Sequence, residues 1–78
     1  MSISVVERAP LATKVTFDSD EMTVELADGR RLSVPLAWFP RLAKASTEAL
    51  GNYELLGDGE GIHWPELDED LSVEGLLR

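Results

Sequence analysis

The sequence contains no cysteine. This absence excludes a disulfide framework, a thiolate metal site and a cysteine nucleophile. Long apolar runs are also missing, since no stretch approaches the roughly 18 residues that a membrane-spanning helix needs. The first residues, MSISVVERAPL, contain an acid and a base early and lack the apolar segment of a signal peptide. We therefore expect a cytoplasmic protein.

Basic residues are scarce in the second part of the chain, where residues 46–78 contain only Arg78. The acids of that part are Glu48, Glu54, Asp58, Glu60, Glu66, Asp68, Glu69, Asp70 and Glu74. Residues 1–45 have equal numbers of acids and bases, so the net charge of -8 arises in the second part. Such a field repels phosphate backbones and attracts a basic partner protein. The alternative is that the acids only keep a small domain soluble.

The length of 78 residues allows one small domain with a limited core. Apolar residues make up 44% of the chain and charged residues 28%, which is typical of a globular protein. We expect one α+β domain over residues 13–78, preceded by an arm over residues 1–12. Ile3 and Val5 of that arm are candidates for a partial edge strand.

Apolar and polar residues alternate with period two over residues 13–34. The inward-facing set on this pattern is Val15, Phe17, Met22, Val24, Leu26, Leu32 and Val34. Ser19-Asp20 and Asp28-Gly29 separate the runs, and an Asp-Gly pair is a strong hairpin signal. The pattern predicts a three-stranded antiparallel meander with one apolar face.

Helical spacing follows Pro35, which ends the third predicted strand. The apolar stripe of the helix predicted over residues 36–45 is Leu36, Phe39, Leu42 and Ala43, with Trp38 beside it. Pro40 predicts a break or a restart within this helix. Ser46 is a suitable N-cap for a second short helix that ends at Gly51.

The last third of the chain predicts a short hairpin and a final helix. Residues 53–56 and 62–64 are the candidate strands, joined across residues 57–61, and Pro65 ends the second. The acids at 68–70 then lead into Ser72, the expected N-cap of a helix over residues 73–77. The predicted fold is α+β, with a three-stranded antiparallel meander, one or two short helices, a short hairpin and a short C-terminal helix.

The glycine-rich stretch GDGEG at residues 57–61 invites comparison with phosphate-binding loops. Such loops need a lysine and a hydroxyl, whereas this one contains Asp58 and Glu60. A turn with positive φ at one or two glycines explains it better. None of the six serines stands in a nucleophile-elbow pattern around His63. We therefore expect no enzyme activity, no catalytic residues and no cofactor.

Metal binding is an alternative that the sequence leaves open. Asp58, Glu60 and His63 offer two carboxylates and an imidazole within six positions. The spacing does not match an EF-hand, and one histidine without cysteine is a poor start for a zinc site. We keep these three residues as a candidate metal-binding or ligand-binding group.

Trp64 precedes a run of carboxylates and has two possible roles. As a core residue it would find a partner for its indole N–H at the edge of the core. As an exposed aromatic anchor it would belong to a docking surface with an acidic rim. In the second case the partner-binding residues are Trp64, Glu66, Asp68, Glu69 and Asp70.

Two segments together, VELADGRRLSVPLAWFPRL and GIHWPELDEDLSVEGLL, resemble the bacterial family catalogued as domain of unknown function 2442 over residues 13–77. The resemblance implies a small α+β domain without established enzyme activity. Members are often encoded beside another small protein and have been grouped with candidate toxin–antitoxin pairs. Some carry a following helix-turn-helix domain, which this sequence does not show, so we expect no direct operator binding.

Charge and resemblance together predict a non-enzymatic interaction module, the acidic antitoxin-like member of a two-protein bacterial pair. Its expected partner is a basic protein, the product of a neighbouring gene. Pairing with a second copy through a sheet edge stays open.

Overall fold

The first half of the chain forms the predicted meander. The computed structural model describes residues 10–77, so the predicted edge strand at Ile3 and Val5 lies outside the described residues. Strands β1 (Ala12–Phe17), β2 (Glu21–Leu26) and β3 (Arg31–Pro35) pair antiparallel in that order. The turn signals are confirmed, because Gly29 has a positive φ of 94° in the second turn. In the first turn the Asp18 carboxylate accepts the backbone N–H groups of Asp20 and Glu21.

One feature of this sheet was not predicted. The β1–β2 register shifts between Ala12 and Lys14, which is the signature of a β-bulge. Thr13 and Lys14 are therefore both exposed, and Val15 returns to the buried face. The strand begins at Ala12, one residue inside the predicted arm.

The predicted helix over residues 36–45 is two elements, as Pro40 indicated. A 3-10 helix η1 (Leu36–Trp38) precedes α1 (Pro40–Ala43), with Pro40 at the first helical position. Leu36 and Leu42 are buried, whereas Ala43 is exposed and does not cover the sheet. Helix α2 (Thr47–Gly51) begins at the expected N-cap, because the Ser46 hydroxyl accepts the Ala49 N–H.

The second half forms another three-stranded antiparallel sheet rather than only a hairpin. Strands β4 (Glu54–Leu56) and β5 (Gly61–Trp64) are the predicted pair, and β6 (Glu69–Ser72) adds a third strand beside β5. The expectation that the acids at 68–70 only lead into the last helix was wrong. Helix α3 (Val73–Leu76) begins as predicted, with the Ser72 hydroxyl accepting the Gly75 N–H.

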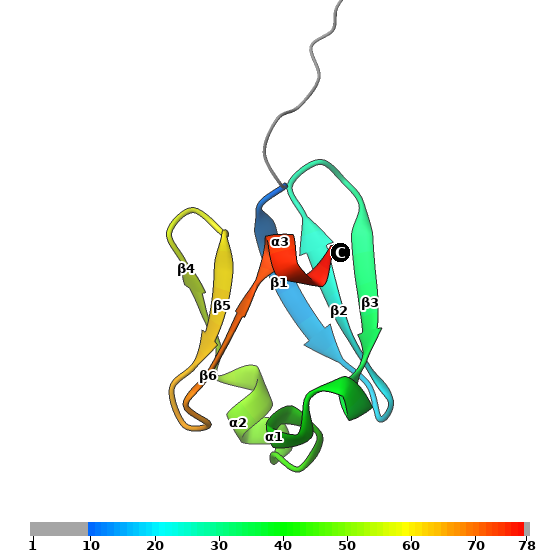
Figure 1. The fold of residues 1–78 in the computed structure, drawn as a ribbon, viewed down its shortest axis with the longest axis vertical. Coiled ribbons are helices and arrows are strands. Elements are labelled where there is room, and N and C mark those ends of the chain that lie inside the picture. Colours follow the sequence, from blue (N-terminus) through cyan, green and yellow to red (C-terminus); the bar gives the residue numbers. More distant parts are fainter. Residues whose placement is uncertain (1–9, 78) are drawn as a thin grey trace, which may run out of the picture.

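The two sheets face one another, and α1 and α2 lie at one end of the layers (Figure 1). The core between the sheets includes Met22, Val24, Leu42, Ile62 and Trp64, each with 0% of its surface exposed. The fold class is therefore confirmed as α+β. None of the described helices is long and apolar enough to cross a membrane.

Hydrogen bonds connect the two sheets along the β1 edge. The Ala12 N–H donates to the Gly59 carbonyl at 2.8 Å, and the Val15 N–H donates to the Tyr53 hydroxyl at 3.0 Å. Gly57 and Gly59 have positive φ, as expected for the glycine-rich turn. This turn therefore supports the fold by placing its backbone against β1.

Candidate functional site

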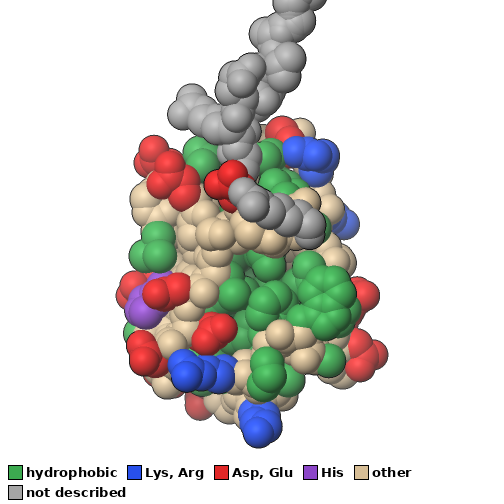
Figure 2. All heavy atoms as spheres, in the orientation of Figure 1, with side chains coloured by type: hydrophobic (Ala, Val, Ile, Leu, Met, Phe, Trp, Pro, Cys, Tyr) green, Lys and Arg blue, Asp and Glu red, His purple; other side chains and the backbone are tan. Residues whose placement is uncertain are grey.

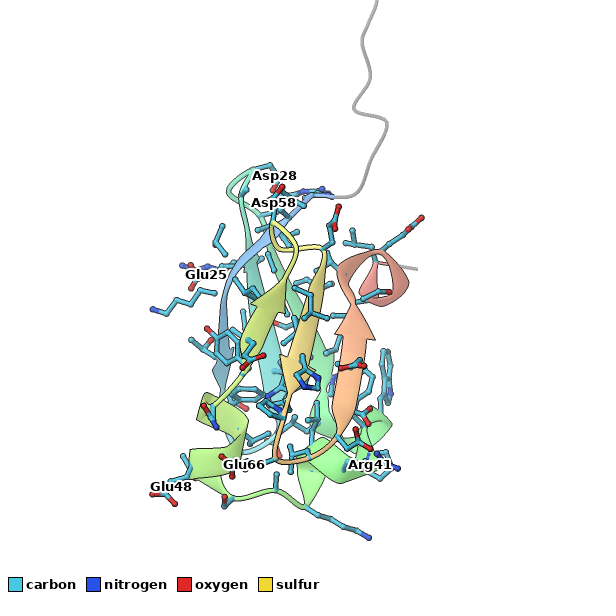
Figure 3. All side chains as sticks on the ribbon, turned by 90° about the vertical axis from the view of Figure 1, so that its left-hand side faces the viewer. Glu25, Asp28, Arg41, Glu48, Asp58 and Glu66 are labelled. Atoms are coloured by element: carbon cyan, nitrogen blue, oxygen red, sulfur yellow. The ribbon has the colours of Figure 1, made fainter. Side chains whose placement is uncertain are left out.

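The outer face of the second sheet carries a row of three ionisable side chains. Antiparallel pairing sets Glu54 of β4 beside His63 of β5, and His63 beside Asp70 of β6. Ile62 and Trp64 point to the core, so His63 points outward, as alternation predicted. Figure 3 views this face, with its three strands nearest the reader.

A hydrogen bond joins the His63 ring to its neighbour in this row. His63 Nδ1 and the Asp70 carboxylate are in direct contact. This bond is the largest cause that raises the pKa of His63. Desolvation opposes it, and the negative charges of Asp70, Glu54 and Asp68 each add a smaller effect in the same direction as the bond. The three carboxylates therefore favour the protonated form of the imidazole.

The raised pKa predicts how stability depends on pH. A group whose pKa is raised on folding stabilises the fold fully below its unfolded pKa, here about 6.5, and loses that contribution as the pH rises through the folded pKa. We expect the thermal midpoint of the wild type, relative to that of His63→Gln, to fall as the pH rises above about 6.5. Scanning calorimetry at closely spaced pH values measures this difference. Parallel curves for the two proteins would contradict it.

The outer face of the first sheet has the opposite charge pattern. There Glu25 of β2 lies between Lys14 of β1 and Arg31 of β3. An acid between two bases leaves that row with an excess of positive charge, whereas the second sheet sets a histidine between two acids. The two outer faces are therefore electrostatically different, and the acidic one belongs to β4, β5 and β6.

The β5–β6 turn and the first residue of β6 carry the remaining predicted docking acids, and two of these acids are engaged within the molecule. The Glu66 carboxylate accepts a hydrogen bond from Asn52 Nδ2 at 2.7 Å. Arg41 Nη1 lies 3.7 Å from Glu69 Oε1 and donates to the Asp68 carbonyl at 2.9 Å. Asp68 has a positive φ of 52°, which an aspartate tolerates. The exposed acids around His63 are thus Glu54, Asp68 and Asp70.

Trp64 must be removed from the predicted docking residues. Its side chain is fully buried, and its Nε1–H donates a hydrogen bond to the Leu50 carbonyl at 3.1 Å. Its ring packs edge to face against Phe17, with 6.3 Å between the ring centroids. The core interpretation is the one that the structure shows. A partner that docks on the native fold cannot contact this ring.

The candidate metal group is not assembled either. Asp58 and Glu60 lie in the β4–β5 turn, whereas His63 lies within β5 beside Glu54 and Asp70. Figure 3 shows Asp58 at one end of the sheet and Glu66 at the other. Within residues 10–77, no group of three or more histidine or acidic side chains could hold a metal ion. The three residues are close in sequence, but residues a few positions apart in an extended strand lie far apart along it.

A hydrogen-bonded histidine and aspartate such as His63 and Asp70 also occur in hydrolytic triads, where a serine is the third member. Ser72 lies two positions along β6, on the same side of the strand as Asp70. Its hydroxyl accepts the Gly75 N–H and caps α3. This serine thus has a structural role, and the pair stands on the exposed face of a sheet.

Two features of this region were not predicted. Glu54 belongs to the acidic row, but only the β4–β5 register shows that it lies beside His63. Trp38 is 67% exposed at the opposite edge of the molecule from β1 and borders a groove between β3 and β6. Its position beside the apolar stripe of the predicted helix was the only sequence signal.

The sequence of residues 12–78 matches the family model described as protein of unknown function (DUF2442). The chain belongs to this family. The chain is also similar to the crystal structure of a protein of unknown function from Rhodospirillum rubrum ATCC 11170. The two are 38% identical with a TM-score of 0.76, over 90% of this chain and 87% of the other. No curated protein matches the chain.

Proposed function

We propose that this DUF2442 domain is a non-enzymatic protein-interaction module, the acidic antitoxin-like member of a two-protein pair. Its partner is a basic protein encoded by a neighbouring gene. The observation that supports the proposal best is the row of Glu54, His63 and Asp70 on the outer face of the second sheet. It brings together on one surface two of the nine acids that lie in the second part of the chain.

The physical basis of recognition is charge complementarity. Exposed acids on one face attract a basic partner over about a Debye length and orient it before contact. The carboxylates of Asp68 and Asp70 stand at the β5–β6 turn and the start of β6, where a partner can approach from solvent. The row on the first sheet, with its two bases, does not offer this attraction.

Charge reversal on this face tests the proposal. We expect Glu54→Lys/Asp70→Lys to weaken binding of the purified neighbouring-gene product about tenfold or more at low salt. Isothermal titration calorimetry measures the affinity. The matched control is Asp20→Lys/Glu48→Lys, which makes the same charge change at two exposed positions off this face.

Both double variants must first show the thermal midpoint of a folded domain. Weakening in the first variant and near wild-type affinity in the control would support the acidic face. Equal weakening in both would mean that only the net charge matters and would contradict a defined surface.

A further inference from the structure

A groove opens between the sheets on the side opposite the bridged β1 edge. Its volume is about 250 Å³. One wall comes from Val34 of β3, Trp38 of η1 and the following Phe39. The other wall comes from Leu71 of β6 and Leu76 of α3. Figure 2 shows apolar side chains gathered over this side of the molecule. We name this hollow the β3–β6 groove.

Trp38 is the unusual residue of the groove. Most large apolar side chains of the described region lie in or against the core, yet 67% of Trp38 is exposed. Tryptophan is enriched among the residues that dominate binding energy, and exposed apolar clusters with polar rims mark interaction sites. Its position in η1, directly after β3, holds the indole at the mouth of the groove.

Strand β6 gives the groove a polar and an acidic side. Among the described residues, β6 pairs with β5 on one edge only, so its other edge is free to pair with an added strand. Asp70, Leu71 and Ser72 of β6 all line the groove. The Asp70 side chain, 69% exposed, stands where the groove meets the outer acidic face.

We infer that the β3–β6 groove docks an extended basic segment of the partner protein. A large apolar side chain of that segment packs against Trp38, and a lysine or arginine lies beside Asp70. The apolar walls match the large apolar side chain of such a segment, the open strand edge matches its extended backbone, and the acidic rim matches its basic side chain. The inference rests on the proposed function and specifies where on the domain, and to what chemistry, the partner binds.

Two defined peptides test the groove on the full 78-residue chain labelled with nitrogen-15. The first is capped Lys-Leu-Lys-Leu-Lys, and the second is capped Lys-Ser-Lys-Ser-Lys with the same charge. We expect the leucine peptide alone to shift the amide resonances of Trp38, Leu71 and Gly75 in a heteronuclear NMR titration. Shifts confined to other residues, or no binding by the leucine peptide, would overturn the inference.

Variants of exposed apolar residues distinguish binding in the groove from nonspecific binding to any exposed apolar side chain. We expect Trp38→Ala to weaken the leucine peptide about tenfold or more. The control is Leu56→Ala, since Leu56 is 42% exposed on β4, outside the groove. Equal affinities for the wild type and Trp38→Ala would overturn the inference.

Other occupants of the groove give distinct results. A dimer in light scattering that Trp38→Ala dissociates would make a second copy the occupant. Groove resonances that shift when residues 1–9 are deleted, without peptide, would assign the groove to the chain's own N-terminal segment. Either result overturns the inference.

The proposed function can fail or stand separately. If the neighbouring-gene product does not bind the wild type, the function fails. If it binds the wild type and Trp38→Ala equally well, only the groove fails.

Discussion

Trp64→Ala is expected to remove a large share of the free energy of unfolding. The substitution removes a fully buried ring, its edge-to-face contact with Phe17 and its hydrogen bond to the Leu50 carbonyl. Truncating a buried aromatic residue typically costs about 3–5 kcal/mol. A domain of this length has a total stability of about 4–12 kcal/mol, so the loss is a large share of it.

The chain supplies its own control for this prediction. Trp38 is 67% exposed, so Trp38→Ala should change the free energy of unfolding by only about 0.5 kcal/mol or less. Urea denaturation followed by far-ultraviolet circular dichroism measures both variants. Similar midpoints for the two would contradict the placement of Trp64 in the core.

Gly59→Ala is the second large effect that we expect. Gly59 has a φ of 113°, and a Cβ atom there would lie 2.3 Å from the Ala12 carbonyl oxygen. To make room for the new methyl group, the β4–β5 turn has to move away from β1. This movement disturbs the hydrogen bond from the Ala12 N–H to the Gly59 carbonyl. Backbone strain together with this clash should cost about 2–4 kcal/mol.

Two other glycines separate the causes of that cost. Gly29 also has a positive φ, 94°, but open space around it, so Gly29→Ala should lose only about 1 kcal/mol. Gly51 has open space and no positive φ, so Gly51→Ala should be neutral or slightly stabilising. The same urea titrations rank the three variants. A cost at Gly59 no greater than at Gly29 would contradict the close approach of the two sheets.

Local signals explain why much of the fold was predictable. Ser46 and Ser72 cap helices, and Pro40 restarts one, through contacts within a few residues. The meander follows from period-two alternation and from a hairpin at Asp28-Gly29. In each case the interaction that decides the structure lies inside the window in which the pattern was found.

Strand β6 was not predictable on the same basis. Glu69 and Asp70 have low strand propensity, and only Leu71 among the four residues of β6 is apolar. The strand forms because pairing with β5 and packing of Leu71 against the core outweigh that propensity. The bulge in β1 likewise depends on its partner strand.

The candidate site shows the same division. The charge count identified the acidic part of the chain, and Asp68 and Asp70 are exposed there as expected. Glu54 was missing from the predicted docking residues because only the strand register places it beside His63. Trp64 was included among them because its closeness in sequence to the acids does not show that its side chain is buried. The predicted metal group is not assembled for a related reason, since Asp58 lies in the β4–β5 turn and His63 lies within β5.

The most direct measurement of the central claim is the affinity between the wild-type chain and the purified neighbouring-gene product at several salt concentrations. We expect a complex whose dissociation constant rises about tenfold or more between about 50 mM and about 500 mM salt, because exposed charges at the interface become screened. No complex at low salt, or an affinity that salt leaves unchanged, would contradict an acidic docking face.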